Sequence, residues 1–174
     1  VVMSIRMGYY KVHFPAEFYT AYFTIKGTGF DYGKMTCSLP VLRRNMREFR
    51  ETHPESGRDQ TANDKLFLRD IKVCEEMLAR GVEFTPIDIY KAKATEFTLT
   101  EEGKIMPSLN SIPGLGDIAA RSIEEEAKKG EFLSMEEFTQ RTKIGKTNAE
   151  LIRSLGLLKS IPETNQLSIF DMMG

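Results

Sequence analysis

The residues with the clearest chemistry lie between Ser111 and Ile123, where a proline and two glycines precede a run of small residues. Pro113 fixes its own φ, whereas Gly114 and Gly116 allow positive φ and have no Cβ to keep a ligand away from the backbone. The first amide groups of a following helix are unpaired and lie at the positive end of its dipole, so they can bind a phosphate. The pattern therefore predicts an anion-binding turn.

Within this turn, Leu115 is expected to point inward and to hold the turn against its helices. The predicted phosphate donors are the amides of the two glycines and of the residues that begin the helix, Asp117 and Ile118. An ordinary connection between two helices also favours proline and glycine, and this alternative stays open. The small residues Ala119 and Ala120 favour phosphate binding, because they let a backbone approach closely.

A weaker turn of the same kind lies further along the chain, at Ile144-Gly145-Lys146. It is followed by Thr147-Asn148-Ala149-Glu150, a capping box in which Thr147 would cap a new helix. The matching phosphate contacts would be Lys146, Thr147 and Asn148. The second turn is therefore a candidate partner of the first, and the two would form one compact helical unit.

The overall charge gives no support to a nucleic-acid partner. The formal net charge of the 174 residues is −1, with a pI near 6.2. Acidic residues also balance the basic ones in the region of the two turns. Any contact with DNA must therefore come from oriented amides and individually placed cations.

Several classes of site and location are excluded or disfavoured. Cys37 and Cys74 are isolated and His13 and His53 lie far from them in sequence, which argues against a zinc site and fits reduced thiols in a cytoplasmic protein. No apolar run is long enough to cross a membrane, so no membrane partner is expected. Scattered acids such as Asp64 and Asp70 lack the pairing that a two-metal polymerase site needs.

The hydrophobic periodicity predicts the elements that must position the turns. It indicates a helix that runs up to Pro15, a second from Pro15 to Gly27, and two more over about 41–52 and 62–80. Alternation between residues 82 and 105 predicts short strands. One helical turn at 108–111, a helix over 117–129 and a helix capped by Ser134 complete a mainly α fold with a small β element.

Several stretches resemble known proteins. The turn at Ile112–Gly116 and its Ala-rich helix resemble the hairpin of helix-hairpin-helix DNA-binding modules. The clamp-binding-like peptide Gln166-Leu167-Ser168-Ile169-Phe170 resembles the pentapeptide by which bacterial replication proteins bind the sliding clamp. Residues 8–24 resemble the fingers segment of bacterial C-family polymerases. Residues 88–90, 94–97 and 162–170 resemble further segments of that family. Nearly the whole chain is therefore similar to the C-terminal part of the PolC-type alpha subunit of DNA polymerase III.

The resemblance implies a domain order and a set of partners. Residues 1–81 would be a helical part of the fingers, 82–105 a connector, 106–159 a tandem helix-hairpin-helix domain and 160–174 a flexible tail. The partners would be duplex primer-template DNA, bound without regard to sequence, and the sliding clamp, in the cytoplasm at the replisome. The fragment would carry no catalytic residue and no cofactor. Magnesium would serve a palm domain outside it, and a monovalent cation could sit at the hairpin.

Some assignments remain open at this level. Lys11 and His13 are candidate contacts to nucleotide or template, whereas the aromatic residue Tyr9 is expected in the core. One predicted helix carries a basic stripe of Arg43, Arg44, Arg47 and Arg50. This stripe is either a solvated face whose arginines pair with Glu48 and Glu51, or a surface that contacts the DNA backbone. A helix-hairpin-helix module of a repair or recombination protein is the main alternative function. A nuclease fragment and a purely structural scaffold are weaker ones.

Overall fold

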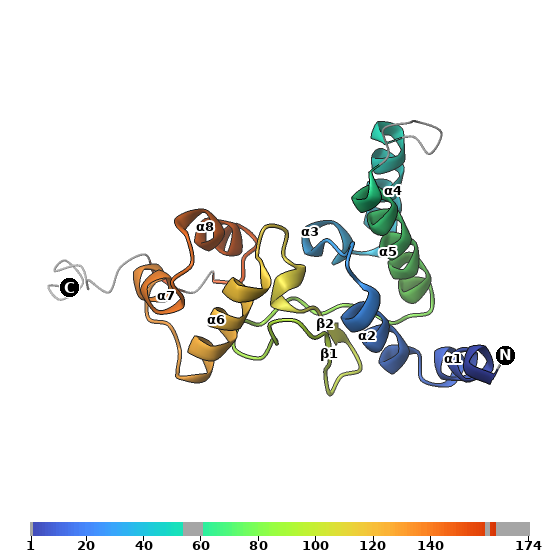
Figure 1. The fold of residues 1–174 in the computed structure, drawn as a ribbon, viewed down its shortest axis with the longest axis horizontal. Helices are drawn as coiled ribbons and strands as arrows, with labels where there is room; N and C mark the ends of the chain where they lie inside the picture. The colour runs from blue at the N-terminus through green and yellow to red at the C-terminus, as the bar shows by residue number, and fades with distance from the viewer. Residues whose placement is uncertain (1, 54–60, 159–160, 163–174) are drawn as a thin grey trace, which may run out of the picture.

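The computed structural model describes residues 2–53, 61–158 and 161–162. One group of helices is formed by α1 (Val2–His13), α2 (Pro15–Lys26), α3 (Tyr32–Met35), α4 (Leu39–Thr52) and α5 (Ala62–Ala79). The other is formed by α6 (Asp117–Lys128), α7 (Met135–Thr142) and α8 (Lys146–Ser154). Between them lie the strands β1 (Thr98–Leu99) and β2 (Ile105–Met106) and the 3-10 helix η1 (Leu109–Ser111) (Figure 1). The mainly α fold with a small β element is confirmed.

The helix boundaries follow from local chemistry. Pro15 occupies the first turn of α2, where a missing N–H leaves no bond unmade. Helix α5 begins with a reciprocal capping box, because the Thr61 hydroxyl accepts from the Asp64 amide and the Asp64 carboxylate accepts from the Thr61 amide. Gly81, with φ of 82°, follows the end of α5 as expected.

Two expectations about local structure are wrong. The short helix α3 lies between the helices expected over Pro15–Gly27 and 41–52, where no helix is expected, and the Asp31 side chain caps it by accepting from the Lys34 amide. The strands expected around residues 84–90 do not form within the described chain, apart from a bridge between Phe84 and Ile105. The Asp88 carboxylate accepts from the Tyr90 amide and turns the chain there.

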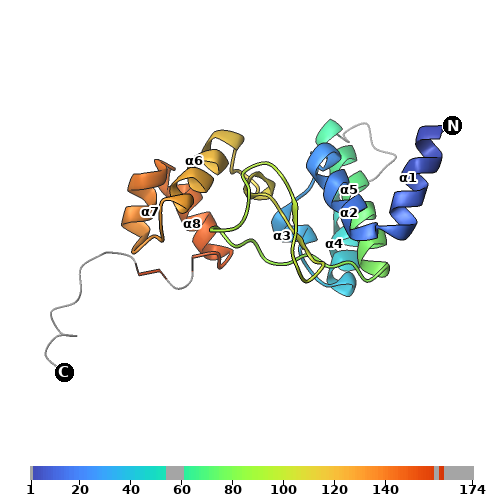
Figure 2. The same ribbon diagram turned by 90° about the horizontal axis from the view of Figure 1, so that it is seen from below.

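Helix α5 buries more residues than any other helix of the first group and packs against α4, whereas α1 packs against α2 at the outer side of the group (Figure 2). The buried Asp70 on α5 accepts hydrogen bonds from the Gly29 amide at 2.8 Å and from the Tyr22 hydroxyl at 3.1 Å. Arg69 forms an ion pair with the same carboxylate. A Cβ at Gly29 would lie 2.3 Å from the carbonyl carbon of Leu66, so only glycine fits. These contacts fix the loop between α2 and α3 on α5.

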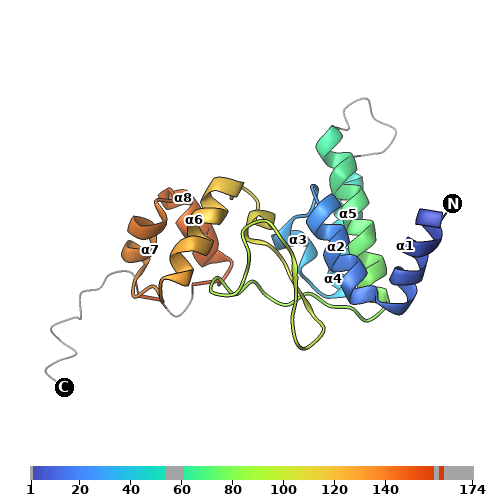
Figure 3. The same cartoon turned by 60° about the horizontal axis from the view of Figure 1, so that its bottom comes forward.

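The segment between residues 82 and 105 lies between the two groups of helices (Figure 3). On one side, the Phe97 amide donates to the Thr24 hydroxyl of α2 at 3.0 Å. On the other, the Ala94 amide donates to the Glu124 carboxylate of α6 at 2.6 Å. The buried apolar residues form one continuous cluster from Tyr19 to Leu158. The expected connector is therefore an integral part of the core.

The folded unit extends slightly beyond the expected boundary at residue 160. The amide of Met135, at the start of α7, donates to the carbonyl of Pro162 at 2.8 Å, and Ile161 packs against the core. Residues 161–162 therefore belong to the helical unit, because they supply an acceptor for an otherwise unpaired helix N-terminus. The rest of the expected tail, including Gln166–Phe170, lies outside the described residues.

Candidate nucleic-acid interface

The two turns that the sequence singles out have the same backbone form. Helix α6 follows Gly116, with φ of −73° and ψ of 165°, and α8 follows Gly145, with φ of −66° and ψ of 153°. Two residues before each glycine the backbone has positive φ, 85° at Gly114 and 55° at Lys143. The residue in between is buried in both cases: Leu115 in the first turn and Ile144 in the second. The expected inward position of Leu115 is confirmed.

The repeat continues into the helices. Residues 114–123 and 143–152 show the same order of exposed, half-buried and buried positions. The buried side chains at matching positions are Ala120 with Ala149 and Ile123 with Ile152. Each helix therefore packs the same face inward and leaves its first turn exposed. This arrangement is the tandem helix-hairpin-helix that the sequence predicts.

The first turns of α6 and α8 are not capped by a described side chain. Both helices begin after a glycine, which has no side chain to accept from the first amides. A Cβ built at Gly116 or Gly145 would meet no described atom within 4 Å, so the space in front of each turn is open. The exposed amides and the positive end of the helix dipole suit an anion at both places.

Of the two helix caps expected in this region, Thr147 and Ser134, only Ser134 is confirmed. Thr147 does not cap α8, because the helix begins one residue earlier, at Lys146, and Gly145 takes the capping position. At α7 the Ser134 hydroxyl accepts from the Glu137 amide, as expected. The Glu137 carboxylate accepts from the Leu133 amide instead of completing the box. Thr147 is therefore an exposed side chain in the first turn of α8.

The surroundings of the two turns differ in charge. The turn at Ile112–Gly116 forms one wall of a cleft of about 710 Å³. The opposite wall is built from the loop between α2 and α3 and from α4 and α5. Asp31 and Asp64 line that cleft, and Asp117 begins α6. The hydroxyl and amide of Thr61 hold the pKa of the Asp64 carboxyl below its usual value, so it stays ionised. The first turn thus has acidic neighbours.

The second turn has basic residues in the corresponding places. Lys143 lies at the position of positive φ, and Lys146 occupies the place that Asp117 has in the first helix. Both lysines are exposed, as are Pro113, Gly114 and Ile118 of the first turn. The predicted contact residues are therefore at the surface, except Leu115, which supports the turn from inside, and Asn148, which is half-buried.

The candidate contact residues of α1 have different surroundings. Lys11 forms an ion pair with Glu76 at 2.8 Å, and its amine lies 5.7 Å from the centre of the Phe18 ring. Lys11 thus connects α1 to α5. His13 is exposed and lies 4.3 Å, between ring centres, from Tyr9. The expectation that Tyr9 is in the core is wrong, because this side chain is 55% exposed.

The basic stripe on α4 is partly neutralised. Arg44 pairs with Glu48, as the solvated-face interpretation expects, whereas Arg43 pairs with Glu75 on α5 at 2.7 Å. Across residues 2–53, 61–158 and 161–162, no three His, Cys, Asp or Glu side chains lie where they could hold a metal ion. The thiol of Cys74 is buried and that of Cys37 is half-buried, and both are free. No helix in this same part of the chain has the length and apolar character needed to cross a membrane.

Comparison with known proteins agrees with this geometry. The family model described as "Helix-hairpin-helix motif" matches residues 81–167, a range that includes β1, β2 and the helices α6 to α8. Among the relatives is a protein of Caldanaerobacter subterraneus named DNA polymerase III PolC-type. It is 37% identical over 170 residues, which cover 98% of this chain and 12% of the relative.

Proteins of the same name in Bacillus cereus and Thermotoga petrophila are 39% and 41% identical, over the same shares of the two chains. The chain thus spans about 12% of the length of these relatives. It belongs to the helix-hairpin-helix family and, over almost its whole length, corresponds to a segment of PolC-type DNA polymerase III.

Proposed function

We propose that this chain holds duplex DNA for a replicative DNA polymerase, through the backbone amides of its two hairpins. The observation that carries the proposal is the repeated geometry at Gly116 and Gly145, where two uncapped helix N-termini open to solvent on one folded unit. Such groups suit phosphates and contact no base edges. Binding is therefore independent of DNA sequence.

The two hairpins contribute in different ways. The first acts through its amides alone, at Gly114, Gly116, Asp117 and Ile118, because its nearest charged neighbours are acidic. The second adds lysine ammonium groups to its amides. Each phosphate that a lysine neutralises releases counterions, so the salt dependence of binding arises mainly at the second hairpin.

The test is duplex binding, measured by fluorescence anisotropy with two labelled duplexes of unrelated sequence. Gly116→Val and Gly145→Val add a branched side chain at each turn, and its Cβ meets no described atom within 4 Å. Each loses one or more hydrogen bonds to a charged group, so we expect affinity to fall roughly 10- to 100-fold. Gly8→Val is the matched control, because a Cβ there also meets open space but lies on α1.

Equal affinity for the two duplexes and a loss in both hairpin variants would support the proposal. Wild-type affinity in a folded Gly116→Val, Gly145→Val double variant would exclude it. The main alternative, a repair or recombination module, predicts the same DNA binding. The similarity to PolC-type polymerases along both groups of helices favours replication.

We also propose that the clamp-binding-like peptide docks in a groove of the sliding clamp. The support is its sequence, in which Gln166 offers a polar anchor and Leu167, Ile169 and Phe170 offer apolar side chains around Ser168. Carbonyl groups of the hairpins would hold a monovalent cation. Magnesium would belong to a polymerase active site elsewhere in a longer chain. His13 remains the more accessible candidate for contact with nucleotide or template, since Lys11 is paired.

A further inference from the structure

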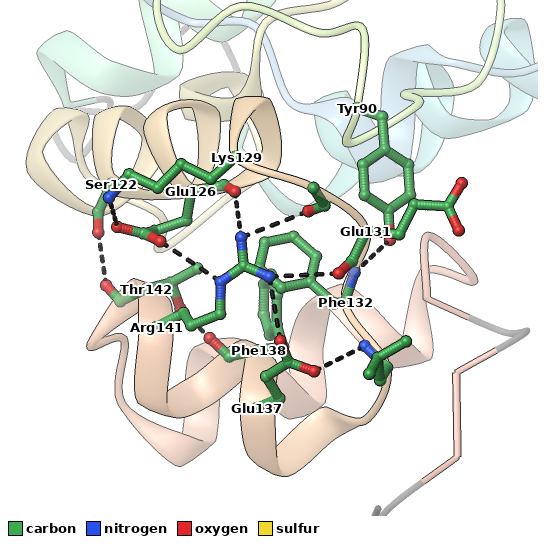
Figure 4. Close-up of polar contacts among 12 residues, drawn as sticks. Tyr90, Ser122, Glu126, Lys129, Glu131, Phe132, Glu137, Phe138, Arg141 and Thr142 are labelled. Atoms are coloured by element: carbon green, nitrogen blue, oxygen red, sulfur yellow. Dashed lines mark hydrogen bonds and ion pairs between the residues drawn. The ribbon is translucent and has the colours of Figure 1, made fainter.

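The connection between α6 and α7 centres on one side chain, that of Arg141 (Figure 4). Its guanidinium donates to the backbone carbonyls of Glu126, Gly130 at 3.3 Å and Glu131 at 3.2 Å. It also forms ion pairs with the carboxylates of Glu126 at 3.4 Å and Glu137 at 3.1 Å. One residue in the last turn of α7 thus holds both the end of α6 and the segment that follows it.

The chemistry of this contact requires an arginine. The Glu126 carbonyl lies in the last turn of α6, at the negative end of the helix dipole, where a cation is favourable. The Gly130 and Glu131 carbonyls belong to the segment after the helix. The planar guanidinium reaches three carbonyls while it lies over the Phe132 ring, 4.5 Å from the ring centre. A lysine ammonium lacks this planar arrangement of donors and cannot replace it. Phe132 is itself buried, against Phe138 of α7.

A second contact joins the same helices one residue further on. The Ser122 hydroxyl of α6 donates to the carbonyl of Thr142 at 2.6 Å. Thr142 is buried, and its own hydroxyl donates to the carbonyl of Phe138. Lys143, with its positive φ, follows directly. The helix of the first hairpin therefore holds the residues that lead into the turn of the second.

We infer that Arg141 is a positioning residue that fixes the spacing of the two hairpins, so that both bind the same duplex. The inference rests on the proposed function. The Arg141 side chain is only 22% exposed and its donors are used by protein carbonyls and carboxylates, so it is not itself a phosphate contact. Two hairpins held at a fixed spacing bind as a bivalent unit, in which the second contact follows the first at high effective concentration.

The carboxylates around Arg141 are held in their charged form. The amide of Leu133 and then the guanidinium of Arg141 keep the pKa of Glu137 below its usual value. Lys129, and after it Arg141, do the same for the pKa of Glu126. The contact is therefore complete at neutral pH, where DNA binding is measured.

The experiment measures duplex affinity of Arg141→Met and Arg141→Lys, each alone and combined with Gly145→Val. Loss of the fixed spacing should weaken binding by about tenfold when both hairpins work. In the Gly145→Val background, the Arg141 substitutions should lower duplex affinity by less than about twofold, because the second hairpin is already disabled. The slope of affinity against salt should fall toward that of Gly145→Val, since fewer phosphates are contacted.

Two further variants serve as a charge control and as a second test of the contact between α6 and α7. Lys128→Met removes the same charge from the exposed end of α6, where Lys128 pairs with Glu124, and should have an equal, small effect in both backgrounds. Ser122→Ala removes the second contact and should repeat the background dependence of Arg141→Met with a smaller loss. Thermal unfolding of each variant shows whether it is folded. If Arg141→Met is unfolded, the comparison of the two backgrounds is made with Ser122→Ala instead.

An equal loss in both backgrounds would overturn the inference, since it would indicate direct contact with DNA or general damage. Wild-type affinity of Arg141→Met, or of Arg141→Lys, would overturn it too. These results are distinct from failure of the proposed function, which would appear as unchanged affinity in Gly116→Val and Gly145→Val themselves.

Discussion

Gly114 and Lys143 occupy matching positions in the two hairpins, two residues before the glycine that precedes each helix, and both have positive φ. Glycine adopts this conformation freely, whereas for a lysine it costs roughly 1–2 kcal/mol. The second hairpin therefore keeps a basic side chain at a position where the backbone favours glycine. The strained backbone lowers stability but places a positive charge at the turn, which is consistent with a contact between Lys143 and a DNA phosphate.

The strain and the charge at Lys143 predict opposite effects of Lys143→Gly on stability and on binding. We expect the free energy of unfolding to rise by about 0.5–1 kcal/mol, because relief of backbone strain exceeds the added flexibility of the unfolded chain. Duplex affinity should fall and its salt slope should decrease by about 1, because one phosphate contact is lost. Urea unfolding and anisotropy on the same sample check both, and a loss of stability would contradict the strain argument.

The partly buried contact between Tyr22 and Asp70 predicts that the free energy of unfolding falls in alkali. Burial, with the negative charge of Asp70, raises the pKa of Tyr22 to about 12. In the unfolded chain a tyrosine ionises near pH 10. The stability from this shift is therefore fully present below about pH 10 and is lost as the pH rises toward 12.

Comparison with Tyr22→Phe isolates this contribution, because both proteins share every other group that titrates in alkali. Urea unfolding at intervals from pH 7 to 12 should show a smaller alkaline loss of stability in the variant. Parallel curves for the two proteins would mean that Tyr22 does not titrate as described.

The clamp-binding-like peptide should act independently of the hairpins. Leu167→Ala combined with Phe170→Ala removes two large apolar side chains, each worth roughly 1.5–3 kcal/mol when buried, and should abolish binding to the sliding clamp. Duplex binding should be unchanged in the same variant. Calorimetry with the clamp and anisotropy with DNA give both results, and a loss of DNA affinity would place the peptide in the folded core.

The chain alone should not extend a primer. No paired carboxylates for two metal ions are visible in the sequence, and the described residues hold no three-residue metal cluster. Incubation with primer-template, nucleotides and magnesium should give no product above background. Extension by the purified chain would contradict this account of where the polymerase active site lies.

The sequence predicts the helices and the hairpins well because their signals are local. Pro15, Gly81 and the run from Pro113 to Gly116 act on the backbone of their own neighbourhood, and the structure agrees with them. The positive φ at Lys143 has no such signal, since lysine rarely adopts it. It arises because Ile144 and Thr142 are both buried and fix the chain on either side.

The expectations that fail depend on tertiary contacts. Tyr9 has the spacing of a core residue, but α1 buries no residue against the rest of the described chain. Lys11 has no partner within its own helix and finds one in Glu76 on α5. The position of Arg141 between two helices likewise cannot be read from its spacing to Glu137, which suggests only a pair within α7.

The central claim is that the amides of two matching turns bind the phosphates of one duplex. The most direct measurement is an NMR titration of the ¹⁵N-labelled chain with an unlabelled duplex, which follows each backbone amide separately. The account predicts that the largest shifts occur together at residues 114–118 and 143–148, at the same DNA concentrations. Shifts confined to one turn, or centred on the basic stripe of α4 while both turns stay unchanged, would contradict it.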